Sequence, residues 1–67
     1  MDVRLRLSLN LQRLRKEKGW SQEELADRAG LHRTYVSGVE RGIRNPTITI
    51  VEKLAVTLET TVGVLAD

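Results

Sequence analysis

The chain has 67 residues, enough for one domain, and its 11 Lys and Arg against 9 Asp and Glu give a formal net charge of +2. It has no cysteine and a single histidine, His32, which excludes a disulfide framework and argues against a zinc cluster. No apolar run reaches the length of a secretory signal or of a membrane span of about 20 residues, so we predict a cytoplasmic protein with no membrane partner.

Basic side chains predominate in residues 1–18 and 28–44, whereas residues 45–67 are mildly acidic. This distribution is a weak sign of a polyanionic partner. A solvated charged face explains it equally well, so charge alone does not decide between the two.

The first predicted element covers about residues 4–18. Its apolar and polar side chains alternate at first, as in a half-buried strand, but Leu7, Leu11 and Leu14 also follow helical spacing and no second strand is near. We therefore predict a helix. Two leucines fall off its apolar stripe: Leu5 and Leu9.

A second helix is predicted to begin at a capping box of Ser21 and Glu24 and to end at Gly30, which supplies a left-handed stop. Its buried face comprises Leu25, Ala26 and Ala29.

A third helix runs from about Arg33 to Arg41, with His32 as its predicted cap. A fourth follows Pro46 and Thr47 and shares one apolar face: Ile50, Val51, Leu54, Ala55 and Leu58. Thr61 is expected to cap a last short turn. The predicted fold class is all-α, with five helices around one core.

Residues 22–41 are typical of a helix-turn-helix, with two helices of about eight residues joined by a tight turn at Gly30. The small side chain of Ala26 allows the second helix to approach closely, and Val36 and Val39 hold that helix against the core. We predict one domain over residues 1–67, with the helix-turn-helix at about 22–41.

Three stretches carry a resemblance to a known family: "LRKEKGWSQEELADRAGL", "RTYVSGVERGIRNPT" and "VEKLAVTL". They resemble the phage repressor and Cro family of regulators, also called the xenobiotic-response-element family. The stretch "HRTYVSGVERGIRNP" is particularly similar to the controller proteins of restriction-modification systems. The resemblance implies a compact lambda-repressor-like DNA-binding domain.

The resemblance also implies roles for individual residues. Gln22 would bind a DNA phosphate and brace the third helix, whose first residues, Arg33 and Thr34, would face base edges. Arg15 and Glu40 match a buried ion pair that joins the first helix to the third. The full predicted DNA-binding set is Gln22, Arg33, Thr34, Tyr35, Ser37, Gly38, Arg41, Arg44 and Asn45.

Structural alternatives remain open for this set. Gln22 could be only a helix-start residue, Arg33 and Arg41 could be solvated, and Tyr35 could be a packing residue whose hydroxyl reaches a phosphate. We expect Arg33 to select sequence by its position at the helix start. We expect Arg44, with Asn45 in a loop over the backbone, to add affinity without sequence preference.

Gly38 falls on the open face of the predicted third helix, where glycine costs roughly 1 kcal/mol against alanine. A residue there would point into the major groove. Glycine could let the helix backbone approach the bases, or leave room for a longer neighbour such as Arg33. The alternative is a glycine tolerated at an undemanding surface site.

We predict a transcriptional regulator that binds double-stranded DNA as a homodimer, on a near-palindromic operator with half-sites about 34 Å apart. The predicted dimer surface is Val62, Val64 and Leu65. An antitoxin-type protein-interaction module with the same fold is the alternative. No enzyme is expected, because a carboxylate pair with a cleft, a Cys–His pair and a phosphate-cradling loop are all missing. We expect no cofactor, metal or small-molecule ligand.

Overall fold

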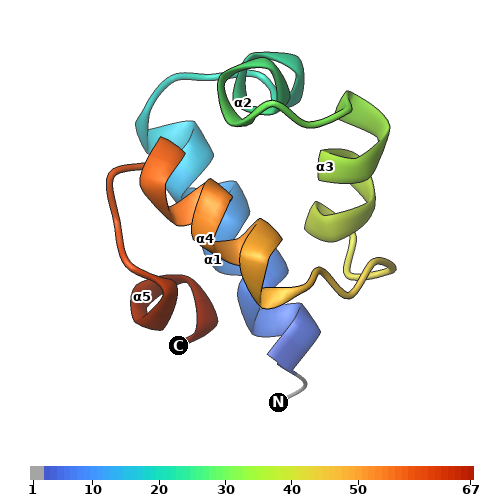
Figure 1. Ribbon diagram of the computed structural model, residues 1–67, viewed down its shortest axis with the longest axis vertical. Coiled ribbons are helices and arrows are strands. Elements are labelled where there is room, and N and C mark those ends of the chain that lie inside the picture. Colours follow the sequence, from blue (N-terminus) through green and yellow to red (C-terminus); the bar gives the residue numbers. More distant parts are fainter. Residues whose placement is uncertain (1–2) are drawn as a thin grey trace.

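The computed structural model describes residues 3–67; the predicted domain bounds also include residues 1 and 2, which lie outside this part. Its helices are α1 (Val3–Glu17), α2 (Gln22–Ala29), α3 (Arg33–Glu40), α4 (Ile48–Thr57) and α5 (Val62–Ala66) (Figure 1). The described residues contain no strand, which confirms the predicted all-helical class with five helices.

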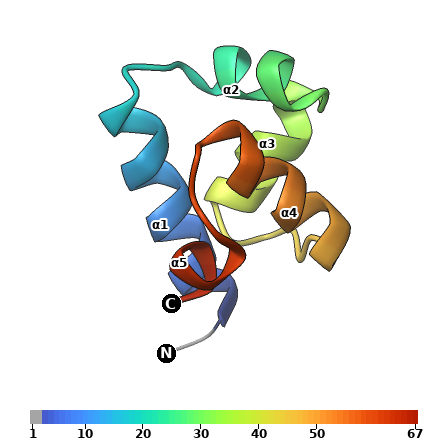
Figure 2. The same ribbon diagram turned by 60° about the vertical axis from the view of Figure 1, so that its left-hand side comes forward.

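The N-terminal stretch, whose alternating apolar and polar residues were also compatible with a strand, forms helix α1. Leu7 and Leu11 are buried and the partly buried Leu14 packs against the core, while Leu5 and Leu9 are exposed. The helical spacing of the leucines therefore decides the element, because it places three of them on the core at once. Figure 2 shows α5 beside α1, and the two helices contact each other.

Helix α2 has the predicted ends. The Ser21 hydroxyl accepts a hydrogen bond of 3.0 Å from the backbone N–H of Glu24. At the other end Gly30 has φ 69°, and the N–H of Leu31 bonds the carbonyl of Ala26 at 2.8 Å. This C-cap gives hydrogen-bond partners to carbonyls at the end of the helix and turns the chain tightly toward α3.

His32 is the N-cap residue of α3, as predicted, but its imidazole makes no capping hydrogen bond. The backbone carbonyl of His32 instead accepts from the N–H groups of Tyr35 and Val36, at 3.0 and 3.1 Å. A bulky imidazole is a poorer cap than the short oxygen side chains that predominate at this position.

Helices α4 and α5 begin at the expected threonines. The hydroxyl of Thr47 accepts from Ile50 N–H at 3.3 Å, and that of Thr61 accepts from Val64 N–H at 3.1 Å. Between the two helices Glu59 has a left-handed φ of 57°. The residue that takes this conformation after a helix is usually glycine.

The helices enclose one buried apolar cluster: Leu7, Leu11, Leu25, Ala26, Val36, Val39, Val51, Leu54, Ala55, Leu58 and Leu65. Figure 1 shows α3 and α5 on opposite sides of α1 and α4. The outer face of α3 and the C-terminal helix are therefore separate surfaces.

Candidate nucleic-acid interface

The C-terminal end of α3 is anchored by Glu40, whose side chain is 2% exposed. Arg15 from α1 binds its carboxylate with two hydrogen bonds, from Nε at 2.7 Å and from Nη2 at 3.0 Å. Gln22 from α2 donates to the same carboxylate at 3.0 Å. The ion pair expected between Arg15 and Glu40 is therefore present and buried, and it joins three helices at one carboxylate.

Two further hydrogen bonds from α1, one from Gln12 and one more from Arg15, complete this anchoring. The amide of Gln12 donates to the backbone carbonyl of Glu40 at 2.7 Å, and a third nitrogen of Arg15 donates to the carbonyl of Trp20 at 2.8 Å. The end of α3 is thus fixed through both backbone and side chain. A helix held in this way presents its opposite face in a defined orientation.

The outer face of α3 carries most of the predicted DNA-binding residues. Helical order places Thr34, Gly38 and Arg41 opposite Val36 and Val39, which are buried in the core. The exposed members of the predicted set are Arg33, Thr34, Arg41, Arg44 and Asn45, and the half-buried ones are Gln22, Tyr35 and Ser37.

Gly38 is buried, so the expectation that it lies open is wrong. The side chain of Arg44 covers it: a Cβ at Gly38 would lie 2.5 Å from Cγ of Arg44. The Gly38 carbonyl accepts from the N–H groups of Ile43 and Arg44 at 3.1 and 3.2 Å. The longer neighbour that uses the missing side chain is therefore Arg44, from the following loop, and not Arg33.

Tyr35 lies beside this contact. Its ring packs against the core, and Cζ of Arg44 lies 5.9 Å from the ring centroid, within the range of a cation–π interaction. The structure thus brings the loop residue Arg44 onto the same surface as Thr34 and Arg41. The sequence had grouped Arg44 with Thr34 and Arg41 as DNA-binding residues, but it did not predict the packing of Arg44 on Gly38 and Tyr35, because the loop length alone does not reveal where the chain returns.

Gln22 is connected to the outer face of α3 through its hydrogen bond to Glu40. Its side-chain amide is half-buried and is used toward Glu40, which agrees with a bracing role. An amide nitrogen carries two hydrogens, so a bond to Glu40 leaves one donor for a phosphate.

The predicted dimer surface is partly wrong. Leu65 is 0% exposed and belongs to the core, and Val62 is half-buried against it, whereas Val64 is 45% exposed. The amide of Asn10 holds α5 against α1 by donating to the carbonyl of Leu65 at 3.0 Å. A five-residue helix has too few positions to show from sequence which side is buried.

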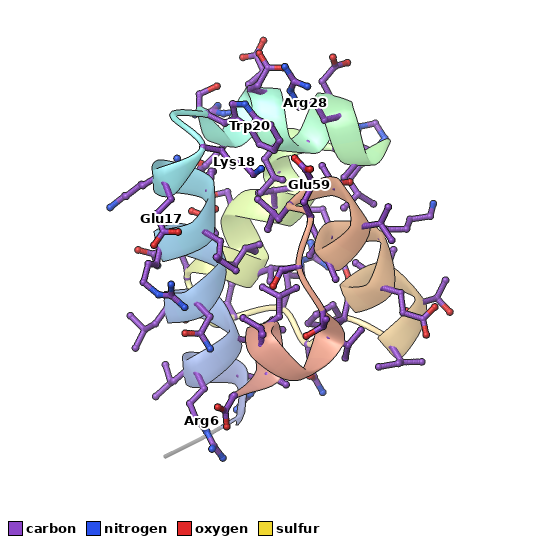
Figure 3. The ribbon with its side chains drawn as sticks, turned by 90° about the vertical axis from the view of Figure 1, so that its left-hand side faces the viewer. Arg6, Glu17, Lys18, Trp20, Arg28 and Glu59 are labelled. Carbon is purple, nitrogen blue, oxygen red and sulfur yellow. The ribbon has the colours of Figure 1, made fainter. Side chains whose placement is uncertain are left out.

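A separate charged cluster lies where α1 and α2 meet (Figure 3). The Trp20 ring has Arg28 Cζ at 4.5 Å and Lys18 Nζ at 5.9 Å from its centroid. Lys18 also pairs with Glu59 at 2.7 Å, and this hydrogen bond and charge lower the pKa of the Glu59 carboxyl. Trp20 lies between the two helices and packs against the core.

None of the helices within residues 3–67 has the length and apolar character that a membrane crossing needs. Among the same described residues, no group of three or more His, Cys, Asp and Glu is arranged to hold a metal ion.

The buried anchor, the tight turn at Gly30 and the exposed face of α3 together define a helix-turn-helix protein. The family model HTH_3, described as Helix-turn-helix, matches residues 11–65. The chain belongs to this family.

Two relatives illustrate the similarity. A Neisseria hypothetical transcription factor from Neisseria meningitidis is 51% identical over 57 residues, which are 85% of this chain and 54% of that protein. The control protein C.SmaI from Serratia marcescens is 44% identical over 62 residues, 92% of this chain and 74% of that protein. The chain therefore spans about half the length of the Neisseria relative.

Solved structures agree with the fold. The hypothetical transcription factor NHTF from Neisseria has a TM-score of 0.96 at 45% identity, over 98% of this chain and 76% of that one. The restriction-modification controller C.AhdI from Aeromonas hydrophila has a TM-score of 0.89 at 44% identity, over 92% and 94%. A tetramer of the controller C.Esp1396I, solved in complex with its natural 35 base-pair operator, has a TM-score of 0.87 at 38% identity, over 97% and 86%.

Proposed function

We propose that this protein is a sequence-specific transcriptional regulator that places α3 in the major groove of double-stranded DNA. The observation that supports this most is the outer face of α3, which combines exposed Arg33, Thr34 and Arg41 with a rigid anchor at Glu40. A helix of this kind fits the major groove, where the pattern of donors and acceptors identifies each base pair.

The proposed contacts follow from position on the helix-turn-helix unit, residues 22–41. Arg33 and Thr34 lie in the first turn of α3, the part that reaches base edges in such units. Gln22 beside Glu40, Arg41 at the C-terminal end of α3 and Asn45 in the following loop are proposed to bind phosphates, and Tyr35 and Ser37 on α3 are proposed to assist them. Phosphate contacts fix the register of the protein on DNA without reading sequence directly.

We further propose that the chain acts as a homodimer on a near-palindromic operator. One α3 of eight residues offers few base contacts, and a two-fold pair doubles them. Since Leu65 is in the core, the proposed interface rests on Val64, the large exposed apolar side chain of α5. This helix lies away from α3, so pairing there leaves the DNA-binding face free (Figure 1).

Similarity to restriction-modification controllers supports a finer proposal. This chain covers 94% of the C.AhdI structure and 74% of C.SmaI, so the likeness extends over most of each controller. We propose a controller-type regulator with no enzymatic activity of its own. A cytoplasmic location stays a prediction.

The test is selection of binding sites from a pool of random duplexes with the purified protein. The proposal predicts enrichment of a near-palindromic sequence, and protection of its two half-sites when the selected duplex is footprinted. Recovery of unrelated sequences after repeated rounds, with no common site, would contradict it.

A further inference from the structure

We propose that Arg6 and Asp67 make one surface of this protein self-complementary, so that Arg6 of each copy binds the Asp67 carboxylate of a second copy. The inference rests on the proposed homodimer and deepens it, because it names the polar contacts that accompany Val64 at the interface. It also gives a use to an arginine that the DNA-binding face does not employ.

The first step is an unsatisfied hydrogen-bond donor on α1. Nε of Arg6 is buried, and within residues 3–67 it has no hydrogen-bond partner. The side chain as a whole is half-buried, so a partner can reach it from outside. A buried N–H group without an acceptor destabilises a fold, and such groups are rare in native proteins. This donor therefore indicates an acceptor that a single copy of the chain does not supply.

The second step is the position of Arg6 relative to α5. Arg6 and Asn10 are one helical turn apart and lie on the same face of α1. The amide of Asn10 donates to the carbonyl of Leu65 at 3.0 Å and approaches that of Val64 at 3.4 Å. This face of α1 is therefore the one against which α5 lies. Figure 3 shows the Arg6 side chain at the N-terminal end of α1, directed away from the other helices.

The third step is the acceptor. Asp67 is the C-cap residue of α5 and is exposed, and it forms no ion pair with any residue in the described part of the chain. Two residues of chain span at most about 7 Å, and Asn10 fixes the carbonyl of Leu65. Asp67 therefore lies on the same surface as Arg6, although the two do not bond each other within one copy.

The fourth step is symmetry. In a two-fold dimer one patch meets the same patch of the partner, so a surface that carries a donor and a separate acceptor can bind itself at two sites. Val64 lies on the same short helix as Asp67 and supplies an exposed apolar contact. The charge distribution agrees, because residues 1–18 are basic and residues 45–67 are mildly acidic. A second copy is therefore the partner that fits this surface.

DNA is the other polyanion-like partner that a basic side chain of this protein could meet. Figure 1 shows α3 and α5 on opposite sides of α1 and α4. Arg6 belongs to the side of α1 that faces α5, so it lies away from the face proposed to enter the major groove. A protein carboxylate therefore fits the position of this donor better than a phosphate does.

The first experiment measures the dimer dissociation constant of the full chain by sedimentation, with circular dichroism as the check on folding. Arg6→Met should weaken dimerisation about 10- to 100-fold, because symmetry removes two contacts and each is worth about three- to tenfold. At concentrations where the protein is monomeric, the same variant should melt at a higher temperature than the wild type, since it loses a buried donor without an acceptor. A lower melting temperature with an unchanged dissociation constant would overturn the proposal and make Arg6 a structural residue of the monomer.

The second experiment reverses the charges. Arg6→Glu places two acidic side chains at each site of its homodimer, and Asp67→Arg places two basic ones there, so each variant alone should dimerise at least about tenfold more weakly than the wild type. A mixture of the two should form heterodimers with nearly wild-type affinity, because both sites then join one basic and one acidic side chain. A mixture that dimerises no better than the separate variants would overturn the proposal, since mixing cannot restore a contact within one chain.

Arg28→Met is the matched control, since it removes one arginine from an exposed pair on α2. It should leave the dissociation constant unchanged, and a loss equal to that of Arg6→Met would assign the effect to net charge and overturn the contact. Failure of the contact alone leaves the selection of DNA by the wild-type protein unaffected. A wild-type chain that stays monomeric at every concentration would instead refute the proposed homodimer and this contact together.

Discussion

Replacement of Arg15 by methionine should destabilise this protein more than any other single change at the surface of α1. The methionine keeps much of the side-chain volume but removes both hydrogen bonds to the Glu40 carboxylate, at 2.7 and 3.0 Å. Only the bond from Gln22 to that carboxylate then remains among its side-chain partners in the structure. A carboxylate that is 2% exposed would be left without a counter-charge.

The expected loss is about 3–5 kcal/mol, the range measured when one partner of a buried pair is removed. A chain of this length has a total free energy of unfolding of roughly 3–10 kcal/mol. Each kcal/mol lowers the melting temperature of a small domain by about 4–8 °C. The variant should therefore melt at least about 12 °C below the wild type, or fail to fold at 25 °C.

The assay is urea unfolding followed by the fluorescence of Trp20, which is the single tryptophan and lies beside the anchor. The control is Arg13→Ala, which breaks an exposed pair and should cost less than about 1 kcal/mol. Arg15→Met combined with Glu40→Leu should recover most of the loss, because no buried charge remains. A cost below about 1 kcal/mol for Arg15→Met alone would refute the anchoring argument.

Three further predictions test other parts of the account. Leu65→Asp should unfold the protein because Leu65 is 0% exposed. Val64→Asp should leave the circular dichroism spectrum unchanged and weaken dimerisation in sedimentation experiments. A dimer unaffected by Val64→Asp would place the interface elsewhere. Arg33→Ala should cost about 1–3 kcal/mol on the selected duplex and relax the preference at one base pair per half-site, and equal loss on a scrambled duplex would make Arg33 a phosphate contact. The bond from Lys18 lowers the pKa of Glu59, so its stabilising effect is present at neutral pH and is lost as the pH falls through that pKa. Lys18→Met should therefore make stability less dependent on pH between about pH 3 and pH 7, and urea titrations that show the same slope for both proteins would contradict this.

Local signals predicted the helix ends well because each depends on a few neighbouring residues. Ser21, Gly30 and Thr61 end or begin helices through hydrogen bonds within the adjoining turn. His32 was the exception, since its backbone fits the position but its imidazole does not cap. The helix-turn-helix followed from the spacing of small and apolar residues.

The contacts that shape the site were harder to predict because they join distant parts of the chain. Helical order correctly places Gly38 opposite the core, but only the course of the loop shows that Arg44 covers it. The same holds for Asn10 and Gln12, which are ordinary polar residues in the sequence and bond the ends of α5 and α3 in the structure. A side chain that crosses between elements leaves no periodic signal.

The central claim is that the outer face of α3 reads base sequence. The most direct test is the affinity of the wild-type protein for its selected duplex and for a scrambled duplex at the same salt concentration. Specific protein–DNA complexes are typically at least about a thousandfold tighter than non-specific ones, and we predict a ratio of that order. Equal affinities for the two duplexes, falling together as salt is raised, would show that the protein binds only the phosphate backbone and would contradict the account.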